Sequence, residues 1–242
     1  MIDLLEGEKM KTLKYKNVVS SILFFVFITL LGCSHSLTTT GNTPPLQPVS
    51  EEKFNASLPK DVYVDSGNRL PVVSRNELTD DKKTTYDGLV SPNTRTLAGI
   101  RGPGGIRLHG SGDLGESKVD RRTQELARLV VSREMDQAFE WTLHEPVALR
   151  FGLEPYIIDV IRNGKSLQGV PEREAAIIQL GREIFQNHKV SPETFTRVLK
   201  QIGKRDLIDI CDYMGNYTKT AILLHAVNAH LPYDRESLLP LE

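Results

Sequence analysis

Three residues of the types used in acid–base catalysis lie near one another in the sequence. Glu140 and His144 are four residues apart, so on one helix their side chains share a face about 5–6 Å apart. Glu125 lies one helix earlier, and an antiparallel return of the chain brings it towards the same place. A carboxylate beside an imidazole fixes its tautomer and favours its charged form, as a general acid or base requires. We therefore take these three as candidate catalytic residues, although spacing alone favours an exposed pair with no chemical role.

The segment that holds these residues is predicted to be helical throughout. From Val119 onward, apolar residues recur at spacings of three and four, without the alternation typical of strands. The expected helices cover residues 119–133, 137–151, 154–162, 172–187, 191–203 and 205–229. Ser191 followed by Pro192 is a typical helix start, and Gly203 is a typical helix end. Six helices joined by short connections predict a compact all-α bundle, which we assign to residues 119–235.

A glycine-rich run precedes this bundle. Glycines occur over residues 99–109 at a density that predicts a loop. The loop belongs to an N-terminal extension, residues 61–118, in which one helix is expected over residues 76–89. The run lacks the lysine and the Ser/Thr of a phosphate-binding P-loop. Arg107 and His109 in this loop are either solvated side chains or anchors for a substrate carboxylate.

The candidate residues belong to a longer pattern that resembles a known family. Its parts, between Leu70 and Pro232, are Gly102-Pro103, Leu108-His109, Arg122, Glu125 to Val131, Phe139-Glu140-Trp141, His144, Ala148, Phe151-Gly152-Leu153 and Asp212 to Tyr217. This pattern is similar to the carboxymuconolactone decarboxylase-like family, relatives of the alkylhydroperoxidase D-like proteins. The resemblance implies an all-α domain of about six to seven helices that assembles into trimers or hexamers.

One branch of this superfamily reduces hydroperoxides with a glutamate, a Cys-x-x-Cys pair and a histidine. Glu125 and His144 match the glutamate and the histidine, whereas Gln137 and Glu140 occupy the two cysteine positions. Without these thiols, peroxide reduction lacks its nucleophile and its resolving partner, so a peroxiredoxin-type antioxidant activity is disfavoured. Cys211 lies among apolar residues near the middle of a helix, and we expect it to be buried and inert.

The decarboxylase branch needs only acid–base groups. The resemblance implies that His144 returns a proton after loss of carbon dioxide, with Glu125 orienting it and Glu140 shaping the pocket. It therefore implies a lyase acting on a small organic acid or lactone, with Arg107 or His109 as substrate contacts. Trp141 is a further candidate for substrate contact, although packing in the core is the simpler explanation. The alternative function is a non-catalytic, oligomeric binding lipoprotein of the same fold.

The N-terminal segment has the pattern of a bacterial export signal. A short basic stretch leads into the apolar residues 18–31, fewer than the roughly 20 that a membrane-spanning helix needs. The sequence Leu30-Leu31-Gly32-Cys33 resembles the lipobox of lipoproteins, in which the cysteine is acylated; an uncleaved signal anchor is the alternative. We predict a signal peptide over residues 1–32, then lipidated Cys33 and a flexible, Ser-, Thr- and Pro-rich linker over residues 33–60.

These features predict a periplasmic protein held to a membrane by its lipid alone. Ser34, where inner-membrane lipoproteins often carry aspartate, favours the outer membrane. A formal net charge of −1 gives no indication of nucleic-acid binding. His225 and His230 lack the spacing of a zinc site. We therefore expect a small-molecule substrate and neither metal nor cofactor.

Overall fold

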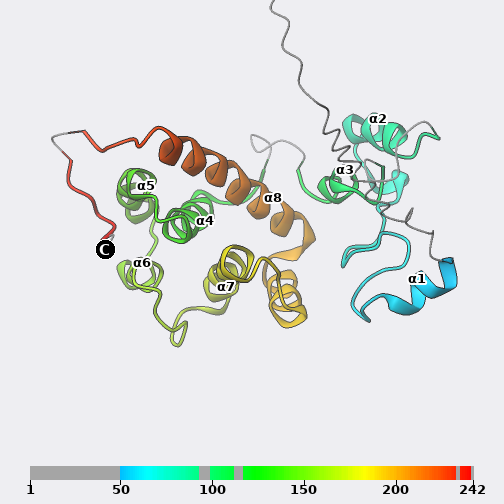
Figure 1. Cartoon of the computed structure of the whole chain (residues 1–242), viewed down its shortest axis with the longest axis horizontal. Coiled ribbons are helices and arrows are strands. Elements are labelled where there is room, and N and C mark those ends of the chain that lie inside the picture. Colours follow the sequence, from blue (N-terminus) through cyan, green and yellow to red (C-terminus); the bar gives the residue numbers. More distant parts are fainter. Residues whose placement is uncertain (1–49, 93–98, 112–116, 233–234, 241–242) are drawn as a thin grey trace, which may run out of the picture. The chain divides into compact units, whose positions relative to one another are not determined.

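The computed structural model describes residues 50–92, 99–111, 117–232 and 235–240. Within these ranges it contains eight α-helices and one 3-10 helix, and its only strand-like feature is a bridge between Tyr63 and Asn68 (Figure 1). The helices are α1 Glu51–Ser57, η1 Arg75–Glu77, α2 Asp80–Leu89, α3 Pro103–Arg107, α4 Arg121–Glu134, α5 Ala138–Arg150, α6 Pro155–Arg162, α7 Glu172–Asn187 and α8 Pro192–Ala226. The predicted all-α fold is confirmed.

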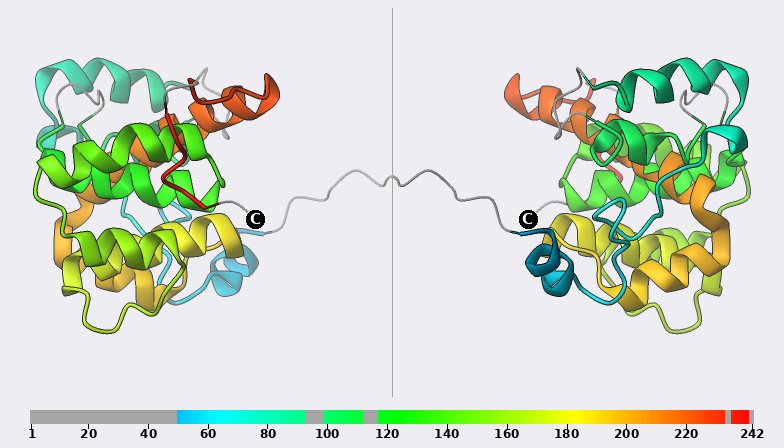
Figure 2. Two further views of the ribbon diagram at one scale, coloured as in Figure 1. Left: turned by 90° about the vertical axis from the view of Figure 1, so that its left-hand side faces the viewer. Right: turned by 90° about the vertical axis from the view of Figure 1, so that its right-hand side faces the viewer.

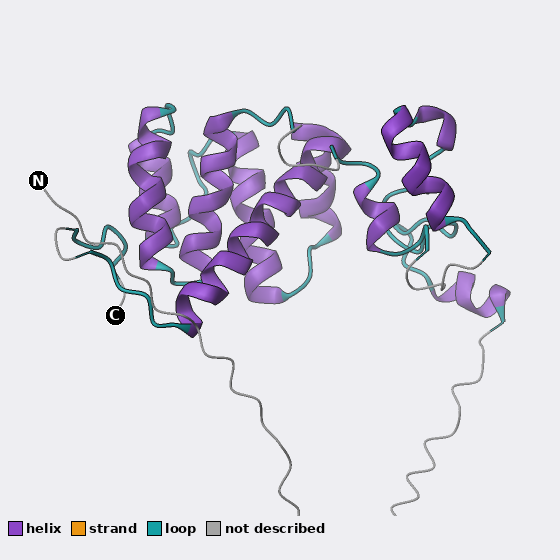
Figure 3. Ribbon diagram, turned by 90° about the horizontal axis from the view of Figure 1, so that it is seen from above, coloured by secondary structure: helices purple, strands orange, loops and turns teal. Residues whose placement is uncertain are grey.

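Helix α4 is the centre of the helical domain formed by α4 to α8. It packs against α5, α6, α7 and α8, and Figure 3 shows these helices lying side by side. Leu126, Leu129 and Val131 on α4 are fully buried, so apolar side chains supply most of the packing energy of this layer. Two buried charged residues, Glu125 and Arg128, interrupt this apolar surface and bring charge into the core.

Helix α8 consists of two arms that meet at Gly203. This glycine has a φ of 75°, a left-handed conformation that lacks a steric penalty only for glycine. The two helices predicted over residues 191–203 and 205–229 are therefore the two arms of α8. Figure 2 shows the golden and the orange arm running in different directions. The bend lets the first arm pack beside α7 and the second beside α4.

The glycine-rich run is more ordered than predicted. Helix α3 occupies part of it, with Pro103 at the first helical position, where the fixed φ of proline favours a helix. Gly105 in this helix packs so tightly that a Cβ atom would lie 1.7 Å from the carbonyl oxygen of Ile100. The prediction of a loop was therefore wrong over residues 103–107, because here glycine permits close packing of the backbone.

Helix α1 lies in the segment predicted as a flexible linker. Ser50 caps it by accepting a hydrogen bond from the backbone N–H of Lys53 at 3.3 Å, and Glu51 and Glu52 stand in its first turn. These favourable end effects outweigh the polar composition, so the linker prediction was wrong over residues 51–57. The predicted signal peptide, Cys33 and most of the linker lie outside the described residues. None of the described helices has the length and apolar character needed to cross a membrane.

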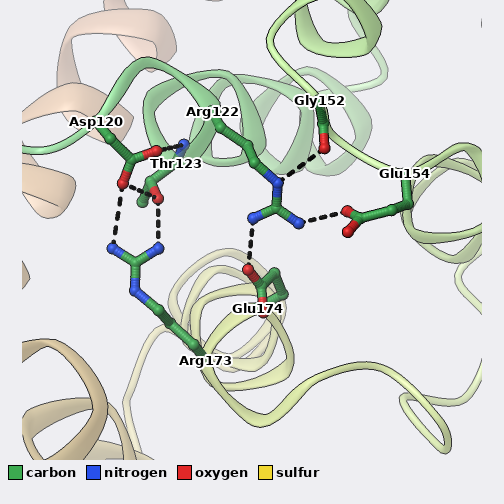
Figure 4. Close-up of polar contacts among 7 residues, drawn as sticks. All are labelled: Asp120, Arg122, Thr123, Gly152, Glu154, Arg173 and Glu174. Carbon is green, nitrogen blue, oxygen red and sulfur yellow. Dashed lines mark hydrogen bonds and ion pairs between the residues drawn. The ribbon is translucent and has the colours of Figure 1, made fainter.

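An arginine fastens the first turn of α4 to its neighbours. Arg122 contacts Glu154 before α6, Glu174 in the first turn of α7 and the backbone carbonyl of Gly152 (Figure 4). The distance to the Glu174 carboxylate is 2.5 Å and that to the Gly152 oxygen is 3.0 Å. These contacts fix the end of α4 from which Glu125 projects one turn later.

Candidate active site

Glu125 and His144 form a buried pair between α4 and α5. The Nδ1 atom of His144 lies 2.9 Å from Oε2 of Glu125, as the spacing and the antiparallel packing of the helices predict. Glu125 is 0% exposed and His144 is 8% exposed. A proton on Nδ1 that is donated to the carboxylate leaves Nε2 as the atom available for proton transfer. The ring of Tyr217 meets the imidazole edge to face, with centroids 5.0 Å apart.

Two arginines share the other oxygen of Glu125. Oε1 lies 2.5 Å from Nη1 of Arg128 and 2.8 Å from Nε of Arg121. Arg128 is buried and lies over the rings of Tyr213 and Tyr217, at 5.5 and 4.9 Å from their centroids. The Arg121 side chain is 45% exposed and carries the cluster to the surface. Two guanidinium groups around one carboxylate leave an excess of positive charge, which suits an anionic ligand.

The ionisation of Glu125 is set by opposing effects. Burial raises the pKa of its carboxyl, but the hydrogen bond with His144 and the charges of Arg128 and Arg121 lower the pKa by more. The net pKa of Glu125 is below its ordinary value. Glu125 therefore remains ionised at neutral pH and can stabilise a protonated His144 ring.

Glu140 lies one turn before His144 on α5 and has no hydrogen-bond partner. It is 2% exposed, and neither carboxyl oxygen meets a donor among the described residues. Burial alone raises the pKa of Glu140 to about 7. An unpaired buried carboxylate is costly, so a large share of Glu140 is protonated near neutral pH. The structure thus places Glu140 beside the pair without joining it to His144.

Arg107 and His109 lie away from this cluster. The Arg107 side chain is 62% exposed and its Nε atom approaches Asp212 at 3.4 Å. Nε2 of His109 lies 2.9 Å from the carbonyl oxygen of Pro71, and burial lowers the pKa of this histidine. Neither side chain contacts Glu125 or His144, so their proposed role as substrate anchors gains no support.

Trp141 belongs to the core. It is fully buried, and its indole N–H donates a hydrogen bond of 2.5 Å to Glu145. The guanidinium of Arg162 lies over the indole, 5.5 Å from the ring centre. Core packing therefore explains Trp141, and the expectation of substrate contact is not supported.

Three members of the cluster were missed from the sequence. Arg121 and Arg128 lie four residues before and three residues after Glu125, so helical spacing alone places all three on one face. Tyr217 lies within the resembling pattern, but no local feature links it to a histidine that precedes it by many residues. Helical spacing could therefore have predicted the two arginines, whereas the position of Tyr217 beside His144 depends on tertiary packing.

The site is almost closed in this single chain. Four cavities among the described residues are lined by other side chains, and neither Glu125 nor His144 lines any of them, including the most apolar one of about 550 Å³. The cluster meets solvent through the exposed part of Arg121 and one edge of His144. Nowhere in the described ranges do three His, Cys, Asp or Glu side chains gather as metal ligands.

Comparison with known proteins gives one match. Residues 105–180 match the model of the Carboxymuconolactone decarboxylase family. The matched segment contains Glu125, Glu140 and His144 and ends within α7. No curated protein and no solved structure matches the chain significantly.

Proposed function

We propose that this protein, whose residues 105–180 match the model of the Carboxymuconolactone decarboxylase family, is a proton-transfer lyase acting on a small organic acid or lactone. The observation that carries this proposal is the buried contact of Glu125 with His144, joined on the same carboxylate by Arg121 and Arg128. A carboxylate that orients an imidazole, next to excess positive charge, is suited to reactions in which an enolate forms and is protonated.

In this reaction the bond between the substrate and its leaving carboxylate breaks, and carbon dioxide departs. The electron pair moves onto the carbonyl or lactone oxygen and produces an enolate, whose negative charge the exposed edge of Arg121 stabilises. His144, protonated at both nitrogens and held by Glu125, donates the Nε2 proton to carbon and then regains a proton from water. We assign substrate contact to Arg121 because it is the exposed member of the cluster.

A hydroperoxidase function is less well supported by these side chains. Gln137, at the first cysteine position, uses its side-chain oxygen to accept a hydrogen bond from the backbone N–H of Phe139 at 3.0 Å and so caps α5. Burial raises the pKa of Cys211 to about 12, which keeps this thiol protonated and weakly nucleophilic. Proton transfer therefore fits the site better than thiol chemistry.

A binding lipoprotein without catalysis is the second candidate. It is favoured by one observation, namely that Glu125 and His144 are almost fully buried among the described residues. In that case the buried pair would serve only to hold α4 against α5.

Both candidates share the same proposed setting. We propose that lipid on Cys33 anchors the chain in the periplasm, to the outer membrane. We also propose a homotrimer or homohexamer, as the family resemblance implies. Ile222, Leu223 and Val227, on the second arm of α8 and just beyond it, expose 55, 61 and 75% of their surface and support an apolar contact between subunits.

The release of carbon dioxide from carboxymuconolactone by the full chain tests the proposed reaction. We expect His144→Asn to lower kcat by at least 100-fold, the size of a general acid–base contribution, and Arg121→Gln to lower kcat/KM by tenfold or more. Arg150→Gln is the matched control, because Arg150 lies over the same Phe151 ring as Arg121 but does not contact Glu125. Equal turnover in wild type and His144→Asn would overturn the proposal, and a folded wild type that releases no carbon dioxide would favour the binding lipoprotein.

A further inference from the structure

A second site lies between the N-terminal extension and helices α7 and α8. It is a cavity of about 550 Å³, which we call the extension cavity. Its apolar walls include Val62, Leu70, Ile106, Ile184, Phe195 and Leu207. Cavities of roughly 300–1,000 Å³ with apolar walls are typical of small-molecule sites in proteins. None of the residues that contact Glu125 lines it, so this cavity is separate from the candidate active site.

Three charged residues line the extension cavity. Arg69 pairs with Asp61 at 2.6 Å and donates a hydrogen bond of 2.8 Å to the backbone carbonyl of Val190. Lys189, the residue before Val190, also lines the cavity, and its ammonium group has no ion pair among the described residues. Two basic residues and one acidic residue therefore line the cavity, while the remaining walls are mostly apolar. Such a distribution fits a ligand with an apolar body and a single anionic head.

The extension cavity presents mostly apolar surface to solvent. Covering this surface with the apolar part of a ligand is favourable, because it removes the surface from contact with water. Most of its lining lies outside residues 105–180, including the whole wall supplied by residues 59–70. The cavity is thus formed mainly by parts of the extension, α7 and α8 that lie outside the segment matching the family model.

We propose that the extension cavity binds a fatty acid, with the acyl chain between the apolar walls and the carboxylate beside Lys189. Arg69 is already paired with Asp61 and that pair carries no net charge, so Lys189 supplies the direct ion pair with the carboxylate. Loss of the Lys189 charge is therefore expected to weaken the binding of fatty acids and to leave the binding of uncharged fatty alcohols unchanged.

Photo-crosslinking tests the site with the full chain. The protein is mixed with phosphatidylcholine vesicles and a diazirine analogue of palmitic acid, irradiated, and mapped by mass spectrometry. We expect saturable labelling of the cavity walls that palmitic acid competes away. Val62→Trp, which fills the cavity, should reduce labelling at least tenfold, whereas Val64→Trp, an exposed position two residues away, should not. Labelling that is unsaturable, or that falls outside the cavity, would overturn the proposal.

If Val62→Trp fails to fold, substitutions of exposed lysines still test the proposal. Lys189→Gln alters an exposed side chain and should lower labelling by the acid severalfold, with labelling by the matching diazirine alcohol unchanged. Lys219→Gln, an exposed lysine on the second arm of α8, should behave as wild type. Equal acid labelling in Lys189→Gln and Lys219→Gln would remove the carboxylate contact from the proposal and, with it, the assignment to fatty acids.

Discussion

Two buried glutamates of the helical domain have opposite surroundings. Glu183 on α7 is 7% exposed, and its carboxylate accepts hydrogen bonds from Thr194 Oγ1 at 2.6 Å, Ser191 N at 2.6 Å and Gln179 Nε2 at 3.0 Å. Glu140 on α5 is 2% exposed, and its carboxylate accepts no hydrogen bond from any described residue. Burial raises the pKa of both carboxyls, but the donors around Glu183 lower its pKa to about 2, whereas the pKa of Glu140 stands at about 7.

The difference shows that donors, more than depth, decide the charge of a buried carboxyl. Glu183 joins the end of α7 to Ser191, the N-cap of α8, so its ionised form stabilises the fold. Glu140 joins no two elements of the described structure in this way, and yet it lies one turn from His144. Groups that are costly and unpaired persist mainly where function needs them. Stability measurements can separate these two roles.

Replacing Glu183 is expected to have the largest effect. A pKa of about 2 against an ordinary 4.5 corresponds to about 3 kcal/mol at pH 7, and loosening of the α8 cap adds about 1 kcal/mol. Glu183→Ala should thus lower the free energy of unfolding by about 4 kcal/mol in urea denaturation. Because the folded pKa is lowered, this stabilisation is present above pH 4.5 and disappears as the pH falls towards 2. Glu193→Ala, an exposed acid in the first turn of α8, is the matched control and should change little.

Glu140 should produce the opposite dependence on pH. Its folded pKa is raised, so its favourable contribution is complete below pH 4.5 and is lost as the pH rises through about 7. The loss amounts to as much as about 3 kcal/mol between these limits. Glu140→Gln cannot ionise, and its stability should therefore decline less than that of wild type between pH 4 and pH 8. Parallel stability curves for the two proteins would show that Glu140 has an ordinary pKa and that a donor reaches it.

Helical periodicity predicted α4 to α7 to within two residues at each end. It succeeded there because the spacing of apolar residues, together with caps such as Asp120 and Gln137, is a local property of the sequence. The contact between Glu125 and His144 was also predictable, since it follows from spacing and an antiparallel return. These patterns could not predict which hydrogen-bond donors surround each buried carboxyl.

The extension was predicted less well because its path depends on tertiary contacts. The backbone N–H of Ser111 donates a hydrogen bond of 2.6 Å to the buried carboxylate of Asp209 on α8. That contact and the close approach at Gly105 draw the glycine-rich run against the domain, with Arg107 and His109 pointing to partners other than the active site. Neither contact could be predicted from the spacing of residues in the sequence.

The smallest expected effect comes from removing a single donor from Glu183. Gln179 lies one turn earlier on α7, and its side chain supplies one of the neutral hydrogen bonds to the carboxylate. Gln179→Leu should lower the free energy of unfolding by about 1 kcal/mol at pH 7, the usual worth of one such bond, and should move the acid loss of stability to a higher pH. Urea denaturation across pH 2 to 7 measures both changes. An unshifted acid transition would mean that Ser191 and Thr194 alone determine the pKa of Glu183, so that the contrast with Glu140 depends on fewer donors than the geometry indicates.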